Sequence, residues 1–236
     1  MLLSILEHFR QYLHLYLEIL SLLIGLFFLK DLKRNKGFIY FIPFLITTVA
    51  VECIAKLLTD VENPNQYRSV RYMIFNVFTT CEFIFYSLIF LIYLSNKTLR
   101  KIIIILIPVY VILVAINIGY IQGTDKFHRY TFLLGCFLMV VYSCFFLYES
   151  ILPDSINIKL SEQPFFWVTI GLLIFYLGSV IINALFEYLT SAALGKQGTQ
   201  IYSYINNSLN VVLYGSFIIA FILCRKNRKT SSSQLS

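Results

Sequence analysis

The stretch Asn76-Val77-Phe78-Thr79-Thr80-Cys81-Glu82-Phe83-Ile84-Phe85-Tyr86 decides the fold, because it sets one carboxylate in the middle of a long apolar run. That run, residues 69–94, is long and apolar enough to cross a bilayer as a helix. A carboxylate at bilayer depth costs several kcal/mol unless it is protonated, paired or hydrated. Glu82 is therefore the first candidate for a functional side chain, and the helices around it are expected to supply its partners.

The rest of the chain has the composition of an integral membrane protein. Of its 236 residues, 58% are hydrophobic and only 13% are charged, whereas a soluble domain carries about 25% charged residues. Recurrent apolar runs predict an all-α bundle of seven transmembrane helices, at residues 12–29, 38–59, 69–94, 99–120, 128–152, 164–190 and 200–224. Residues 1–224 are thus expected to form one transmembrane domain, and residues 225–236 a short basic, serine-rich tail.

The basic residues predict how this bundle is oriented. Of the 19 Lys and Arg, twelve fall on the side that carries residues 30–36, 97–101, 159 and 225–229, six fall on the other side, and Lys56 lies inside a span. Loops rich in Lys and Arg remain in the cytoplasm, so the carboxyl terminus is expected inside and the amino terminus outside. We expect a multi-pass protein of the cell inner membrane, and we attribute its charge of +7 to orientation and not to nucleic-acid binding.

Most polar side chains within the predicted spans lie in the half of each helix that is nearer the outer membrane surface. Several are spaced four residues apart, and such pairs share one face of a helix. Because lipid excludes polar faces, these stripes predict a polar cavity in the outer half of the bundle, floored near Glu82 and closed below by apolar packing. The candidate ligand-binding residues are Glu82, Asn76, Glu52, Lys56, Glu18, His14, Asn183, Glu187, Asn206 and Asn210.

Structural roles remain alternatives for several of these residues. Glu52 and Lys56 have the spacing of an intrahelical ion pair. The asparagines have the chemistry of hydrogen bonds between membrane helices. Asn183, Glu187 and His14 have the positions of solvated residues at the membrane surface.

The sequence lacks the residues that several kinds of chemistry require. The predicted last span has no lysine for a retinal Schiff base. The three histidines, His8, His14 and His128, are too few and too scattered for a zinc hydrolase. No phosphate-binding loop, nucleophile elbow or dinucleotide fingerprint is present. We therefore expect no catalytic residues, no metal site and no cofactor.

Residues 82–86 (EFIFY) and 164–176 (PFFWVTIGLLIFY) resemble small seven-helix integral membrane proteins of Bacteroidetes-type bacteria. The resemblance implies a sensory role beside a separate signalling protein. It supplies no catalytic residue.

Together these patterns favour a receptor-like or sensory membrane protein that takes a small polar ligand from the outer side. Glu82 and Glu52 are expected to contact positive charge on that ligand, with Lys56 balancing Glu52. Because the tail is too short for an output domain, a cytoplasmic signalling partner such as a histidine kinase is expected. Two alternatives stay open: a small-solute or proton-coupled transporter with Glu82 as its coupling carboxylate, and an intramembrane lipid-modifying enzyme.

Overall fold

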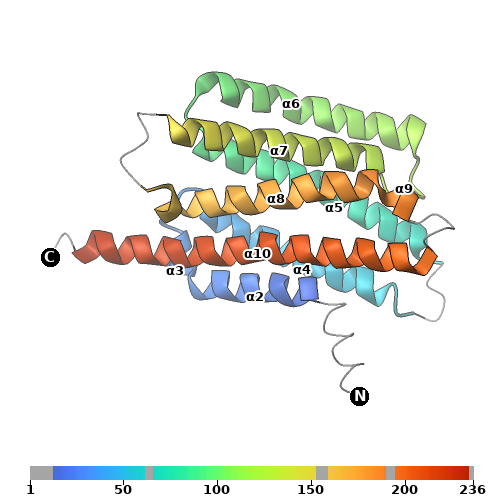
Figure 1. The fold of residues 1–236 in the computed structure, drawn as a ribbon, viewed down its shortest axis with the longest axis horizontal. Helices are drawn as coiled ribbons and strands as arrows, with labels where there is room; N and C mark the ends of the chain where they lie inside the picture. The colour runs from blue at the N-terminus through green and yellow to red at the C-terminus, as the bar shows by residue number, and fades with distance from the viewer. Residues whose placement is uncertain (1–12, 62–65, 153–158, 190–194, 234–236) are drawn as a thin grey trace, which may run out of the picture.

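The computed structural model describes residues 13–61, 66–152, 159–189 and 195–233. Within these ranges the chain is helical and has no strand (Figure 1). The main helices are α2 (Leu13–Phe27), α4 (Phe41–Leu57), α5 (Arg68–Tyr93), α6 (Lys97–Ile116), α7 (Arg129–Ile151), α8 (Pro164–Ala184) and α10 (Gly195–Ser233). Short elements join them: α3 (Leu29–Leu32), α9 (Phe186–Leu189), the 3₁₀ turns Phe38–Tyr40 and Leu160–Glu162, and the π-helical turn Asn117–Ile121.

Six of these helices, in the described part of the chain, are long and apolar enough to cross a membrane. The predicted helical membrane bundle is therefore confirmed at the level of a multi-pass protein. The expected first span, residues 12–29, is represented by the shorter α2, whose 15 residues end at Phe27. At the other end, α10 continues through Ser233, so helix extends into the tail predicted for residues 225–236.

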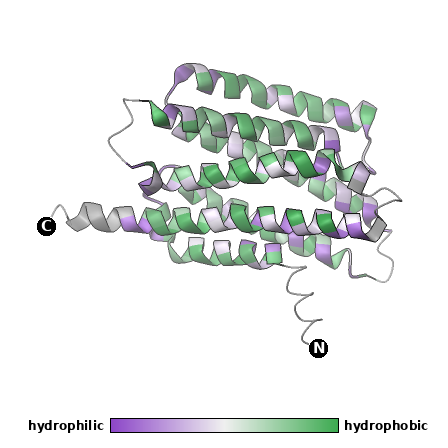
Figure 2. Cartoon of the chain, in the orientation of Figure 1, coloured by the Kyte–Doolittle hydropathy of each residue, from purple (hydrophilic) through white to green (hydrophobic). Residues whose placement is uncertain are grey.

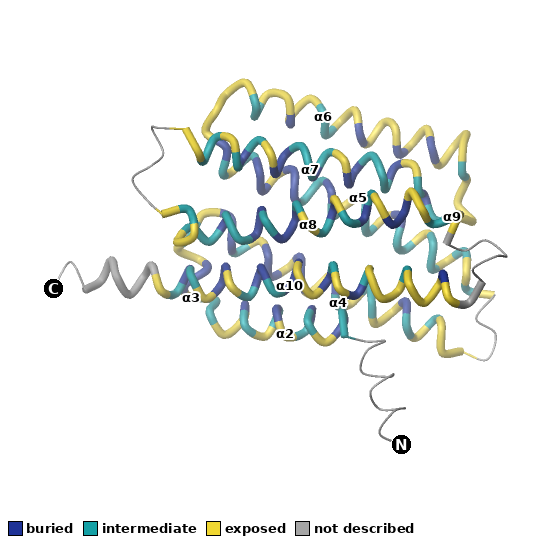
Figure 3. The backbone as a smooth tube through the Cα atoms, in the orientation of Figure 1, coloured by how far each residue is buried: buried dark blue, intermediate teal, exposed yellow. Residues whose placement is uncertain are grey.

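The helices pack as a ring that follows chain order. Helix α2 lies against α4 and α10, and α4 lies against α5. Helix α5 packs on both α6 and α7, while α8 packs between α7 and α10 and closes the ring (Figure 1). Hydrophobic residues dominate the middle of the helices (Figure 2). On α6 many of them, such as Ile104, Ile105 and Ile112, are exposed on the outside (Figure 3), as expected for a face that contacts lipid.

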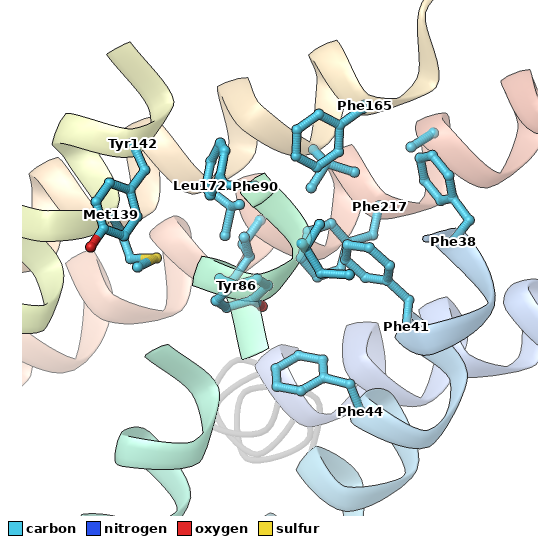
Figure 4. Packing of buried hydrophobic residues seen from close by; sticks show 14 of the residues in the cluster. Phe38, Phe41, Phe44, Tyr86, Phe90, Met139, Tyr142, Phe165, Leu172 and Phe217 are labelled. Carbon is cyan, nitrogen blue, oxygen red and sulfur yellow. The ribbon is translucent and has the colours of Figure 1, made fainter. Parts of the chain in front are cut away.

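Aromatic rings close the bundle near one end. We call this the basic end, because it carries residues 30–37, 94–101 and 159–164, and it lies on the left in Figure 1. The fully buried ring of Phe41 packs edge to face on Phe217, with centroids 5.3 Å apart, and Phe90 packs similarly on Phe165 at 5.5 Å (Figure 4). Such contacts exclude water from the centre of the bundle at this end.

Hydrogen bonds tie the helix ends together at the basic end. The carboxylate of Glu149, at the end of α7, accepts from the backbone N–H groups of Ser95 and Asn96 at 2.7 and 3.1 Å. The Tyr93 hydroxyl donates to the carbonyl of Lys36. These bonds join α7 and the segment before α4 to the end of α5, so the basic end is cross-linked as well as tightly packed.

Two glycines let α8 approach α10 closely. A methyl group on Gly171 would overlap the Ser216 side chain of α10, and one on Gly178 would lie 2.5 Å from a methyl of Leu209. Gly171 and Gly178 are seven residues apart and face the same neighbouring helix. The close approach supports a packing role for these glycines.

Candidate functional site

A charged cavity opens between α2, α4 and α5 at the end of the bundle opposite the basic end. Its volume is about 440 Å³, and its polar lining consists of His14, Glu52, Lys56, Thr59, Asp60, Arg71 and Tyr72. We call it the ionic cavity. Three of the predicted ligand-binding residues, His14, Glu52 and Lys56, therefore line one cavity.

Helix geometry and cross-links between helices build this cavity. Glu52 and Lys56 share a face of α4 because they are four residues apart. Across the cavity, Nε2 of His14 on α2 lies 4.0 Å from Oε2 of Glu52. Arg71 of α5 donates from Nη1 to the Thr59 hydroxyl at 2.5 Å, which joins the end of α4 to α5. The cavity thus offers both carboxylates and cations to a ligand of a few heavy atoms.

A second carboxylate lies deeper on α2, one turn after His14. Glu18 is only 2% exposed, and its Oε2 atom has no hydrogen-bond partner among the described residues. Its carboxylate interacts with Tyr214 of α10 and with the carboxylates of Glu52 and Glu82. A buried, incompletely satisfied carboxylate is costly in a membrane protein, so Glu18 is a strong candidate for a functional residue.

Glu82 lies beside the interior and also reaches the lipid-facing side. It is half-buried and lines an apolar groove of about 430 Å³ between α4 and α5, together with Tyr40, Pro43, Phe44, Phe78 and Leu88. On its inner side it interacts with Tyr176 of α8 and with Glu52. Glu82 does not line the ionic cavity itself, and its connection to that cavity runs through Glu52.

The carboxylates are surrounded by buried tyrosines. Tyr86 is fully buried in the centre of the bundle (Figure 4), interacts with both Glu18 and Glu82, and has a hydroxyl without a hydrogen-bond partner among the described residues. Glu18, Glu52 and Glu82 therefore form one interacting group, which we call the carboxylate group. It extends from the ionic cavity towards the middle of the bundle.

Asn76 makes two hydrogen bonds to backbone groups, which agrees with the structural alternative given for the asparagines. Its Nδ2 donates to the carbonyl of Lys126 at 2.9 Å, and its Oδ1 accepts from the backbone N–H of His128 at 2.9 Å. Both partners belong to the segment between α6 and α7, which the side chain therefore clamps to α5. Its polar atoms are used by backbone groups, so the structure supports a structural role for Asn76 over ligand binding.

Replacing Asn76 by alanine is expected to release this segment, because a buried and a partly buried backbone group lose their partner. Each lost bond of this kind costs about 1–3 kcal/mol. Hydrogen exchange followed by mass spectrometry should show faster exchange across residues 122–130 and unchanged exchange in α8. Asn76→Asp, which keeps the acceptor for His128 and loses the donor to Lys126, should have an intermediate effect. Unchanged exchange in both variants would contradict the clamp.

The remaining predicted residues are spread over α8, α9 and α10. Asn183 donates to the carbonyl of Ser179 at 2.9 Å and lines a separate chamber. Asn210 donates to the carbonyl of Asn206 at 3.0 Å, so this pair bonds within α10. Glu187 belongs to α9, but its side chain lies outside the described residues.

Sequence reasoning did not assign roles to several residues around the ionic cavity. Asp60 and Arg71 line it, and Asn207 interacts with His14. Asp60 was detectable, because it continues the four-residue spacing of Glu52 and Lys56 in the sequence, although it lies in the turn after α4. The sequence gave no comparable signal for Arg71, because an arginine near the start of a span is explained equally well as a charge at the membrane surface. No group of three or more His, Cys, Asp or Glu is arranged to hold a metal ion within the part of the chain that the structure describes.

Fold and composition together define the class: a helical, multi-pass membrane protein with a charged cavity at one end and buried carboxylates beneath it. Comparison of the chain with family models, with curated proteins and with solved structures finds no match. Function is therefore inferred from the chemistry of the cavity and of the carboxylate group alone.

Proposed function

We infer that the protein is a receptor-like, sensory membrane protein whose ionic cavity binds a small polar ligand with a positively charged group. One observation carries this proposal: the charged cavity occupies one end of the bundle, while packed aromatic rings close the other end. A cavity closed at its base suits a ligand that binds and leaves on the same side. It suits a continuous transport path less well.

The orientation proposed from the basic residues turns the ionic cavity outwards. With the basic end in the cytoplasm, the ligand arrives from outside the inner membrane, and the signal leaves at the basic end. A cytoplasmic partner, such as a histidine kinase, would read the arrangement of the helices there. The residues that such a partner meets first are Lys33, Arg34, Lys97 and Lys101.

The carboxylate group suggests how binding is communicated. Glu52 lines the cavity and interacts with Glu18 and Glu82, and the three carboxyl groups repel one another when they are ionised. A cation bound at Glu52 would offset this repulsion and favour a closer arrangement of α2, α4 and α5. A ligand shifts a conformational equilibrium only by its differential affinity for the two states, and the relieved repulsion supplies such a difference.

Native mass spectrometry of gently purified protein tests the proposal. The wild type is expected to retain a defined small mass, and Glu52→Gln is expected to lose it because the variant removes the charge that faces the ligand. Glu162→Gln is the matched control, since Glu162 is exposed at the basic end, and it should retain the mass. If no mass is bound and no small amine raises the melting temperature of the wild type, the receptor proposal fails.

A proton-coupled carrier is the second candidate, and the carboxylate group is the observation that favours it. The group leads from the ionic cavity towards Glu82 in the middle of α5. Carriers place coupling residues near the bilayer midplane. If the bound solute accumulates in vesicles that contain the protein, and Glu82→Gln abolishes accumulation, the carrier replaces the receptor as the better proposal.

A further inference from the structure

The apolar groove between α4 and α5 opens on the lateral surface of the bundle, beside Glu82. Its volume is about 430 Å³, and Glu82 is the only charged side chain among the described residues that line it. Exposed side chains form its two rims, which are Tyr40, Pro43 and Thr47 on the α4 side and Cys81, Leu88 and Ile92 on the α5 side. Because the outer faces of membrane-spanning helices contact lipid, we call it the lateral groove.

The spacing of the rim residues is that of a surface on which another helix packs. The α5 rim has intervals of seven and four residues, and the α4 rim has intervals of three and four. Side chains at such intervals form ridges, and the groove between two ridges accepts a ridge of a third helix. The lining extends along α5 from Phe78 to Ile92, which is about 21 Å at 1.5 Å per residue. The lateral groove is therefore long enough for several turns of a docked helix.

Stacked aromatic rings form the floor of the lateral groove. The rings of Phe44 on α4 and Phe85 on α5 are nearly parallel, with an interplanar angle of 4° and centroids 4.3 Å apart. Phe44 also packs on Tyr86, with centroids 5.1 Å apart (Figure 4). Tyr86 is fully buried, so the floor is anchored in the interior of the bundle. Docking on such a preformed surface does not require the floor to become ordered first.

Glu82 lies near the middle of α5 and is accessible from this groove, because it is half-buried and lines it. No Lys, Arg or His of the described residues forms an ion pair with it. On the facing rim, the Thr47 hydroxyl donates to the carbonyl of Pro43 at 2.9 Å, so this donor is used within α4. A carboxylate at membrane depth is costly without a partner. An occupant that brings a cation to Glu82 would remove this cost.

The depth of Glu82 favours a protein helix over a lipid as that occupant. A lipid keeps its charged headgroup at the membrane surface, about 15 Å from the midplane, whereas a helix carries a Lys or Arg at mid-depth where it meets a carboxylate. A second copy of this chain matches less well. In the helices that the structure describes, Lys and Arg lie near helix ends or in the polar extension of α10.

We propose that the lateral groove docks a transmembrane helix of a different membrane protein, and that a Lys or Arg near the middle of that helix pairs with Glu82. The docked face of the partner is otherwise apolar, with side chains at three- and four-residue spacing that fit between the two rims. This interaction goes beyond the receptor function proposed above. It requires no ligand in the ionic cavity, so each of the two proposals can fail without the other.

A designed transmembrane peptide tests the site in vesicles of phosphatidylcholine. The peptide consists of leucine and alanine with one central lysine, and its control peptide has leucine at that position. Energy transfer between a dye on the protein and a dye on the peptide gives a dissociation constant as a peptide mole fraction. The wild type is expected to bind the lysine peptide about tenfold more tightly than the leucine peptide, as for a charge-assisted contact. Glu82→Gln should remove this preference.

Two further variants test the place of docking without changing the carboxylate. Leu88→Trp adds bulk to a rim position that is 50% exposed, and it should weaken binding of the lysine peptide several-fold. Ile105→Trp is the matched control at a 54% exposed position of α6, and it should bind like the wild type. Equal affinity of the wild type for the two peptides, or an unchanged preference in Glu82→Gln, would overturn the proposal and leave the groove to lipid chains.

Cys81 reports which molecule occupies the groove, because it is exposed and lies on the α5 rim. A cysteine placed beside the central lysine of the peptide should form a disulfide with Cys81 when iodine oxidises the two thiols. The yield should fall in Glu82→Gln, and Cys144, which is exposed on α7, should react only at the background level. Disulfides between Cys81 of two copies that persist in excess peptide would instead assign the groove to a second copy and contradict the proposal.

Discussion

Gly135→Ala is expected to lower the free energy of unfolding by about 1–3 kcal/mol, the range for overfilling a packed interior. Gly135 of α7 faces Phe83 of α5, and a methyl group built on it would overlap the aromatic ring. The ring cannot turn away, because it is 2% exposed and packs on Tyr110, Phe132 and Tyr176 at centroid distances of 5.5–5.9 Å. The added methyl must therefore push α7 away from α5.

Gly215→Ala in α10 is the matched control. No atom comes within 4 Å of a methyl group built on Gly215, and alanine favours a helix over glycine by up to about 1 kcal/mol. This variant is expected to be as stable as the wild type or more stable. Both variants are measured by thermal melting of detergent-purified protein, with size-exclusion chromatography as the check for aggregation. If Gly135→Ala melts like the wild type, α5 and α7 are not as close as described.

The number and nature of the helices were predictable because hydropathy reports directly on length and apolar character. Where each helix ends, and where its geometry changes, depends on long-range contacts that the periodicity of the sequence does not record. The π-helical turn Asn117–Ile121 ends the α6 segment where Asn117 meets the side chain of Gln122. Nothing in the local pattern distinguishes that turn from ordinary helix. Similarly, the helix that continues past Cys224 to Ser233 follows an apolar span into a polar sequence, where hydropathy gives no signal.

The candidate site was predictable where its residues share one helix. The spacing of Glu52 and Lys56 indicated a common face, and both line the ionic cavity. Asn76 also lies on a polar face, but its partners are backbone groups about 50 positions further along the chain. The second cavity, which Arg68, Lys126 and Arg129 line, was missed because these residues lie near helix ends, where membrane proteins commonly carry interfacial charge. Only the assembled bundle shows that they line one space.

Glu82→Gln is expected to stabilise the unliganded bundle by about 1 kcal/mol, or roughly 2–4 °C in melting temperature for a chain of this length. Glu82 interacts with Glu52 and with Glu18, and these carboxyl groups carry charge of the same sign when they are ionised. Glutamine has the same shape and stays beside Tyr176, so the change removes mainly the repulsion. Glu162→Gln, at the exposed basic end, should leave the melting temperature unchanged.

A double-mutant cycle between Glu82→Gln and Glu52→Gln distinguishes repulsion within the carboxylate group from other causes. If the two carboxylates repel each other, either variant relieves the same interaction, so the double variant should gain less than the sum of the single gains. An amine that binds the ionic cavity should then stabilise Glu82→Gln less than the wild type, because less repulsion remains to be offset.

A lower melting temperature for Glu82→Gln would instead mean that a bound cation already compensates Glu82. The carboxylate would then be a ligand of that cation, and its retention in the middle of α5 would reflect stability. A higher melting temperature would mean that the bundle gives up stability to keep a responsive charge there, as functional sites commonly do.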